Sequence, residues 1–123
     1  MSKIVFDAEK ARRRISVSLP SFQGTELNFY VDLTVWEERE LSQKYPKYRD
    51  ENHPDSFDFV VDTISKSLIS WNFTDKEEKD IPTTEAPTIF KKLPTTDLKY
   101  IIDKIREAKE QTVGGLGLEL SQK

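Results

Sequence analysis

The side chains best suited to bind a metal ion surround the single histidine of the chain. His53 lies among Asp50, Glu51 and Asp55, in the stretch KYRDENHPD. Imidazole and carboxylate groups are ligands for hard or borderline divalent cations. Zinc sites, however, usually combine several His or Cys ligands, and this chain has one histidine and no cysteine. We therefore predict a solvated loop at this position, with no metal site and no cofactor.

Residues for catalysis are equally scarce. A nucleophile needs a base within hydrogen-bonding distance, and the one histidine lies in a polar linker. Adjacent carboxylates such as Glu77 and Glu78 belong to a charged turn, where they favour solubility over acid–base chemistry. The sequence therefore predicts that the protein is not an enzyme.

The composition bounds the size and the class of the protein. Its 123 residues suggest one domain with a modest core, and with 33% charged and 36% hydrophobic residues some of the chain is expected to be disordered. The net charge of -3 argues against a nucleic-acid binder, because phosphate neutralisation needs an excess of basic residues. Arg12, Arg13 and Arg14 form either a basic arm for a nucleic acid or acidic partner, or a solvated edge that discourages strand pairing. The second interpretation is favoured.

Targeting signals are not evident in the sequence. The apolar cluster Ile4-Val5-Phe6 is too short for the core of a signal peptide, and no window approaches the roughly 20 apolar residues of a membrane span. We expect a cytoplasmic protein with no membrane partner. The glycosylation sequon at Asn72 is then a coincidence, because the side chain would not meet the glycosylation machinery. The lack of cysteine is compatible with a reducing compartment.

The N-terminal third predicts a β-hairpin. Ile15, Val17 and Leu19 alternate with serines, Pro20 ends this strand, and a second alternation includes Leu27 and Phe29. A two-stranded hairpin is marginal in water, so a layer of helices should cover its apolar face.

Four helices follow in the prediction. Thr34 and Glu37 form a capping box that starts a helix over about 35–45, with Val35, Trp36 and Leu41 as its buried stripe. A polar loop covers 46–54. A more apolar helix starts at a cap, Asp55 or Ser56, and ends near Ser70, with apolar residues at three- and four-residue spacing: Phe57, Val60, Val61, Ile64, Leu68 and Trp71.

The chain then turns at Asn72, which we expect in the left-handed conformation, and Phe73 returns to the core. A charged turn covers 75–80. Thr83 and Thr84 cap a short helix that ends at Leu93. Thr95 or Thr96 caps a last helix to about Gln111, whose apolar stripe is Leu98, Ile101, Ile102 and Ile105.

The predicted fold class is α+β and mainly α: an N-terminal β-hairpin packed on a bundle of about four helices. We expect a flexible leader over 1–12, one globular domain over 13–111 and a flexible tail over 112–123. The apolar residues in the two termini, Ile4-Val5-Phe6 and Leu116-Leu118-Leu120, are either free for a partner or clamped onto the same domain.

The order of these elements resembles that of the tail assembly chaperones of long-tailed bacteriophages. The resemblance covers roughly residues 13–110, from RISVSLPSFQGTELNF through VWEERELSQ to SWNFTDKEEKDIPTT and LPTTDLKYIIDKI. The most specific part is the exit Trp71-Asn72-Phe73, the acidic turn and Ile81-Pro82. In such proteins a turn glycine is common where this chain has Glu78 or Lys79.

The resemblance implies a non-enzymatic chaperone in the host cytoplasm. Such a protein would bind the long helical tape measure protein and help tail tube subunits polymerise around it, so the tail tube protein is a second implied partner and self-association a further possibility. Many of these phages also make a longer product by translational frameshifting near the end of the gene. A flexible tail is where such an extension would begin.

Two other functions are compatible with the sequence. The main rival function is a minor structural protein of the phage tail or a head–tail connector, and a third is a small DNA-binding regulator that uses the arginine arm. Side chains expected to matter for partner binding, each also a candidate for the core, are Trp36, Phe57, Trp71 and Ile101, to which the tail adds Leu116 and Leu118.

Overall fold

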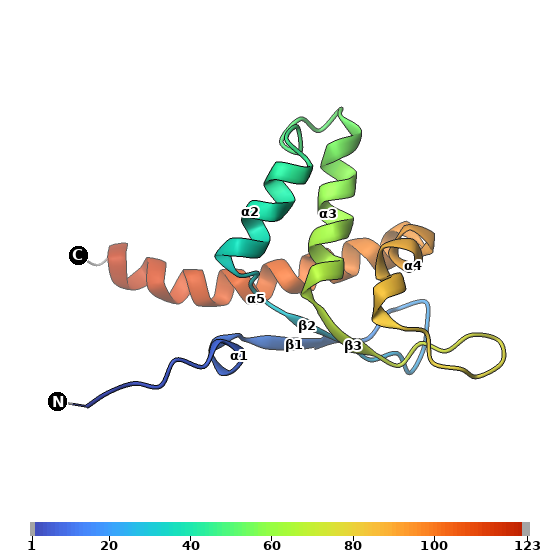
Figure 1. Ribbon diagram of the computed structural model, residues 1–123, viewed down its shortest axis with the longest axis horizontal. Helices are drawn as coiled ribbons and strands as arrows, with labels where there is room; N and C mark the ends of the chain where they lie inside the picture. Colours follow the sequence, from blue (N-terminus) through green and yellow to red (C-terminus); the bar gives the residue numbers. More distant parts are fainter. Residues whose placement is uncertain (1, 122–123) are drawn as a thin grey trace.

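The computed structural model describes the backbone of residues 2–121 and the side chains of residues 2–111. The elements in chain order are α1 (Ala8–Ala11), β1 (Arg14–Val17), β2 (Leu27–Tyr30), α2 (Val35–Lys44), α3 (Pro54–Ser67), β3 (Leu68–Trp71), the 3-10 helix η1 (Thr83–Glu85), α4 (Ala86–Lys92) and α5 (Thr95–Ser121). The α+β class is confirmed. Figure 1 shows the larger helices on one side of a small sheet, with α2 and α3 side by side and α5 crossing behind them.

The predicted hairpin forms, and its register follows the alternation in the sequence. In the antiparallel pair of β1 and β2, Val17 lies opposite Leu27 and Ile15 lies opposite Phe29. Leu27 and Phe29 are fully buried beneath the helices, whereas Ser16 is exposed on the other face. The period of two thus places one apolar face of the hairpin against the helical layer.

A third strand completes the sheet, which has the order β1-β2-β3 with all neighbours antiparallel. The prediction that one helix continues to Ser70 was wrong, because α3 ends at Ser67 and Leu68 starts β3. Leu68 and Trp71 fit the helical spacing of α3, but the backbone of this segment pairs with β2 instead. The register shifts between Asn28 and Phe29, which marks a bulge between β2 and β3.

The core lies between the sheet and α3, α4 and α5. Phe29 from the sheet faces Phe90 from α4 with their ring centroids 6.3 Å apart, and Val61 and Ile101 are fully buried beside them. The backbone N–H of Ser21 in the hairpin loop donates to the buried carboxylate of Asp97 at 3.2 Å. This hydrogen bond fixes the loop to the first turn of α5.

The start of α2 agrees with its capping box. The Glu37 N–H donates to the Thr34 hydroxyl at 3.1 Å, and the Thr34 N–H donates to the Glu37 carboxylate at 2.9 Å. The predicted buried stripe was correct only at Leu41. Val35 and Trp36 are 85% and 66% exposed, since they lie in the first turn of α2, which no other element within residues 2–111 covers.

Other predicted helix ends also differ from the structure. The N-cap of α3 is His53, whose Nδ1 accepts the N–H of Asp55 at 3.0 Å, so neither Asp55 nor Ser56 is the cap. Thr83 and Thr84 do not cap α4 but form η1 in front of it. The last helix, α5, continues beyond Gln111 to Ser121. The predicted leader over 1–12 contains α1.

Candidate partner-binding groove

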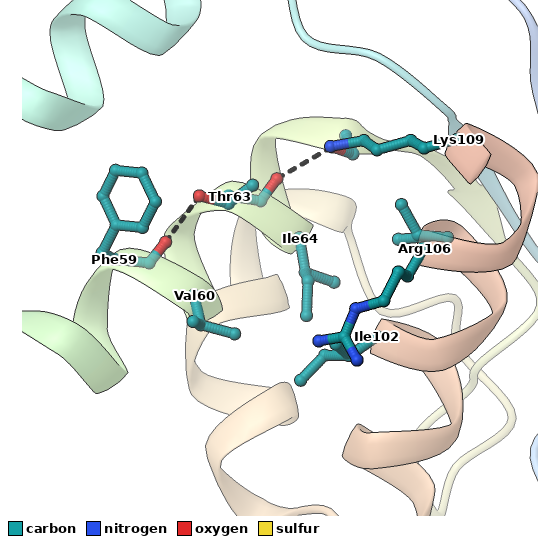
Figure 2. Close-up of a pocket in the computed structure, with 9 residues that line it drawn as sticks. Phe59, Val60, Thr63, Ile64, Ile102, Arg106 and Lys109 are labelled. Atoms are coloured by element: carbon teal, nitrogen blue, oxygen red, sulfur yellow. Dashed lines mark hydrogen bonds between the residues drawn. The ribbon is translucent and has the colours of Figure 1, made fainter. Parts of the chain in front are cut away.

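An apolar groove runs between α3 and α5. It has a volume of about 220 Å³, and its lining residues are Phe59, Val60, Thr63, Ile64 and Ser67 from α3 and Ile102, Ile105, Arg106 and Lys109 from α5. Figure 2 shows Val60 and Ile64 of α3 facing Ile102 and Arg106 of α5 across the space between the two helices, whereas the Phe59 ring points away from α5. We call this feature the α3–α5 groove.

The three- and four-residue spacing of apolar side chains on both helices produces the floor of the groove. On α3, Val60 and Ile64 are one turn apart, and on α5, Ile102 and Ile105 are one turn apart. Ile64 and Ile105 are buried in the main core, whereas Val60 and Ile102 are only partly buried against it. In the groove, therefore, apolar side chains that belong to the core-facing stripes of α3 and α5 remain partly accessible to solvent.

The hydroxyl groups in the groove are already paired within α3. Thr63 Oγ1 donates to the carbonyl oxygen of Phe59 at 2.6 Å (Figure 2). Ser67 Oγ donates to the carbonyl oxygen of Thr63 at 2.9 Å. Their donor capacity is satisfied inside the helix. The surface that these residues present to a partner is consequently more apolar than their types suggest.

The charges at the rim of the groove are positive. Arg106 and Lys109 extend from α5 along the groove, and none of the nine lining residues is acidic. Arg106 Nη1 lies 3.8 Å from Asp103 on its own helix. The chain as a whole carries a net charge of -3. The groove lining thus carries positive charge on a chain that is negative as a whole, and one acidic side chain, Asp103, lies beside Arg106.

A second hollow continues the groove toward α2. It has a volume of about 540 Å³, and it shares Phe59, Thr63 and Lys109 with the α3–α5 groove. Its α2 side includes the exposed Val35. The two hollows together form a continuous surface over three helices, in which Phe59 stands between the two parts and stacks on Tyr48 with ring centroids 4.0 Å apart.

The structure distributes the predicted partner-binding residues over separate places. Trp36 and Phe57 are 66% and 51% exposed, whereas Ile101 is fully buried and Trp71 is half-buried against the core. None of these four lines the α3–α5 groove or the hollow beside it. The side chains of Leu116 and Leu118 lie outside the described part of the chain.

The sequence alone did not predict the groove. Val60, Ile64, Ile102 and Ile105 were recognised only as core stripes of the two helices. The sequence signal for a binding surface was the position of two cations, Arg106 and Lys109, one turn beyond Ile102 and Ile105 on the same helix. This pattern indicates a groove only once it is known that α3 lies beside α5.

Trp71, Asn72 and Phe73 have a structural role. The Trp71 ring packs edge-on against Phe73 and Phe90, with centroid distances of 5.3 Å and 5.8 Å. Asn72 accepts the N–H of Glu26 at 2.8 Å and donates to the carbonyl oxygen of Gly24 at 2.9 Å. The expected left-handed conformation belongs to Glu78, with φ 62°, and not to Asn72.

The arginines near the N-terminus are engaged with the domain. Arg12 pairs with Glu37 at 3.1 Å, donates to the carbonyl oxygen of Asp32 and lies over the Tyr30 ring at 3.6 Å from the ring centroid. Arg13 pairs with Asp32 at 2.7 Å and donates to the carbonyl oxygen of Ala108 in α5. These contacts give Arg12 and Arg13 a role in joining the hairpin to α2 and α5.

Ionisable groups with altered pKa values lie away from the groove. The pKa of Tyr45 is raised because its hydroxyl donates to the Asp62 carboxylate, and partial burial acts in the same direction. The Lys44 ammonium pairs with the same carboxylate at 3.1 Å, which raises the pKa of Lys44. Among the side chains of residues 2–111, no group of three or more His, Cys, Asp or Glu is arranged to hold a metal ion.

Comparisons with known proteins do not extend these findings. No helix within the described residues is long and apolar enough to cross a membrane. Searches with family models, against curated proteins and against solved structures found no match to the chain.

Proposed function

We propose that this protein is a non-enzymatic tail assembly chaperone of a long-tailed bacteriophage. In this proposal it acts in the host cytoplasm, binds an amphipathic helix of the tape measure protein in the α3–α5 groove and helps the tail tube protein polymerise. The resemblance in sequence supports the family. The observation that supports the binding mode is the apolar groove with a basic rim between two helices.

Helix-in-groove recognition explains why this surface suits such a partner. An amphipathic helix places its apolar stripe into a hydrophobic groove, and the charges beside the stripe select the partner and its orientation. Val60 and Ile102 offer apolar contacts at the floor, and Arg106 and Lys109 offer ion pairs at the rim. A partner helix with an apolar stripe flanked by Asp or Glu can make both the apolar contacts at the floor and the ion pairs at the rim.

A peptide titration tests the binding mode directly. Two fluorescent helical peptides share the same apolar stripe and differ only in flanking Glu or Lys residues, and anisotropy measures their binding to the full chain. We expect the Glu peptide to bind more tightly, with an affinity that falls as salt rises. The double variant R106E/K109E should lose this preference. The matched control, K92E/K99E, makes the same charge change at exposed positions outside the groove lining and should keep it.

A pull-down tests the biological assignment. The tagged chain is expressed with the neighbouring phage genes, and mass spectrometry is applied to the eluate and to purified particles. Recovery of a long helical tail protein from the lysate, with this chain absent from particles, would support the chaperone function. Stoichiometric presence in particles would instead identify a minor tail or connector subunit and overturn the proposal.

A further inference from the structure

The N-terminal segment is an extended apolar arm that contacts little of the domain. Ile4, Val5 and Phe6 are 94%, 86% and 89% exposed, and Asp7 continues the segment in an extended conformation. Figure 1 shows this arm, residues 2–7, leading away from the sheet. Three consecutive apolar residues at this exposure are a surface that association would bury.

The β1 edge of the sheet offers hydrogen-bonding groups that match such an arm. β1 pairs only with β2, and the Val31 N–H donates to the carbonyl oxygen of Arg13 at 2.9 Å. Because backbone groups alternate in direction along a strand, those of Arg14 and Ser16 point away from β2. Within residues 2–121 no other strand pairs with that side of β1. The outward side of β1 therefore has no strand partner, although α5 contacts β1 and its Ala108 accepts a hydrogen bond from Arg13 beside it.

One antiparallel register satisfies both the apolar pattern and the charges. If Asp7 of the arm lies opposite Arg14, Val5 lies opposite Ser16 on the open face of the sheet. Ile4 and Phe6 then fall on the helix-covered face, in line with Val17 and Ile15. Asp7 and Arg14 have opposite charges and would be adjacent on the open face.

We propose that the arm of a second copy of this chain adds to the β1 edge as a fourth strand, with each copy giving its arm to the other. The arm precedes β1 in the same chain and is separated from it by α1, whose Glu9 accepts a hydrogen bond from Tyr30 of β2. This contact favours an arm directed away from its own edge. A two-fold axis near α1 places each arm beside the β1 strand of the partner, which gives a closed dimer.

Disulfide trapping tests the register. The chain has no cysteine, so an introduced pair reports a single contact. A mixture of V5C and S16C chains, oxidised together, should give a crosslinked heterodimer, because directly opposite residues have Cα atoms about 5.5 Å apart. A mixture of I4C and S16C is the matched control and should crosslink weakly, since Ile4 would project to the opposite face.

Two crosslinking results would overturn the proposal. A double variant, V5C/S16C, that oxidises to a crosslinked monomer would show that the arm folds onto its own edge. Equal crosslinking of the V5C and I4C chains, or no crosslinking at all, would show that the arm has no defined register on β1.

Sedimentation equilibrium of the full chain provides the second test. The dimer dissociation constant should rise by about tenfold or more in I4S/F6S, which removes the two side chains on the covered face, and much less in V5S. R14E should weaken the dimer, and the added change D7K should restore it. Equal effects of I4S/F6S and V5S, or a wild-type chain that stays monomeric, would overturn the proposal. Binding of the Glu peptide to the α3–α5 groove is measured in parallel, because it does not depend on the arm.

Discussion

The indole N–H of Trp71 donates a hydrogen bond to the carbonyl oxygen of Ile81, 2.6 Å away. This bond joins the end of β3 to the segment that leads into η1, and the N–H of Ile81 in turn donates to the carbonyl oxygen of Phe73 at 3.0 Å. The acidic turn between these residues is thus closed at its base by a side chain and by the backbone. Trp71 connects the sheet, this turn and Phe90 of α4.

Truncation of Trp71 should destabilise the fold. We expect W71A to lower the free energy of unfolding by about 3 kcal/mol or more, because the change removes two aromatic contacts and leaves a cavity. Urea denaturation followed by circular dichroism measures the change. W71F, which keeps a ring and loses the hydrogen bond, should have a smaller effect.

The exposed Trp36 provides the control for this prediction. W36A should change the free energy of unfolding by less than about 0.5 kcal/mol, because most of the Trp36 side chain is already in water. If W71A and W36A had equal effects on the urea midpoint, the structural role of Trp71 would be refuted.

Glycine at position 78 should stabilise the acidic turn. Glu78 has φ 62°, a left-handed conformation that costs a residue with a Cβ atom roughly 1–2 kcal/mol. E78G relieves this strain but increases the freedom of the unfolded chain, so we expect a net gain of up to about 1 kcal/mol. Thermal melting at fixed pH measures the gain.

The neighbouring Glu77 is the matched position for the E78G experiment. Its backbone lacks a positive φ, and its N–H donates to the Asp75 carboxylate at 2.8 Å. E77G should therefore lower the melting temperature. If E78G lowered the melting temperature as E77G does, the claim that the backbone of Glu78 is strained would be contradicted.

Removal of the capping hydroxyl at Thr34 should weaken α2. T34A leaves the Glu37 N–H without its acceptor, and we expect a loss of about 1 kcal/mol in the free energy of unfolding. T34S retains the hydroxyl and should lose much less. Equal urea midpoints for T34A and T34S would show that the capping box contributes little.

The contact between Tyr45 and Asp62 should make stability depend on alkaline pH. The raised pKa of Tyr45 means that folding favours its protonated form, so the contribution is fully present below the unfolded pKa of about 10. It is lost as the pH rises through the higher pKa of the folded state. The raised pKa of Lys44 acts in the same direction and in a similar range of pH.

The variant Y45F isolates the tyrosine contribution. The difference in unfolding free energy between the wild type and Y45F should shrink as the pH rises above about 10, because only the wild type has a hydroxyl to deprotonate. Urea titrations over a series of pH values provide the measurement. A difference that stays constant over this range would argue against the coupling.

The sequence predicted elements whose signals are local. The alternation around Val17 and Phe29 fixed the hairpin and its buried face, and the capping box of Thr34 fixed the start of α2. The acidic turn was also correct. The resemblance placed a turn glycine at either Glu78 or Lys79, and Glu78 is the only non-glycine residue among those described that has a positive φ.

Only the tertiary structure decided which competing local preference prevails. Leu68 and Trp71 continue the helical spacing of α3, yet β2 supplies hydrogen-bonding partners that are distant in sequence, and the segment becomes β3. Trp36 was expected in the core, but within residues 2–111 no element packs over the first turn of α2, and the ring is 66% exposed. The α3–α5 groove exists because two core stripes, each complete in its own helix, meet at an angle that leaves part of their apolar surface uncovered. Local sequence determines which side chains are apolar, and the packing of distant elements determines which of them remain exposed.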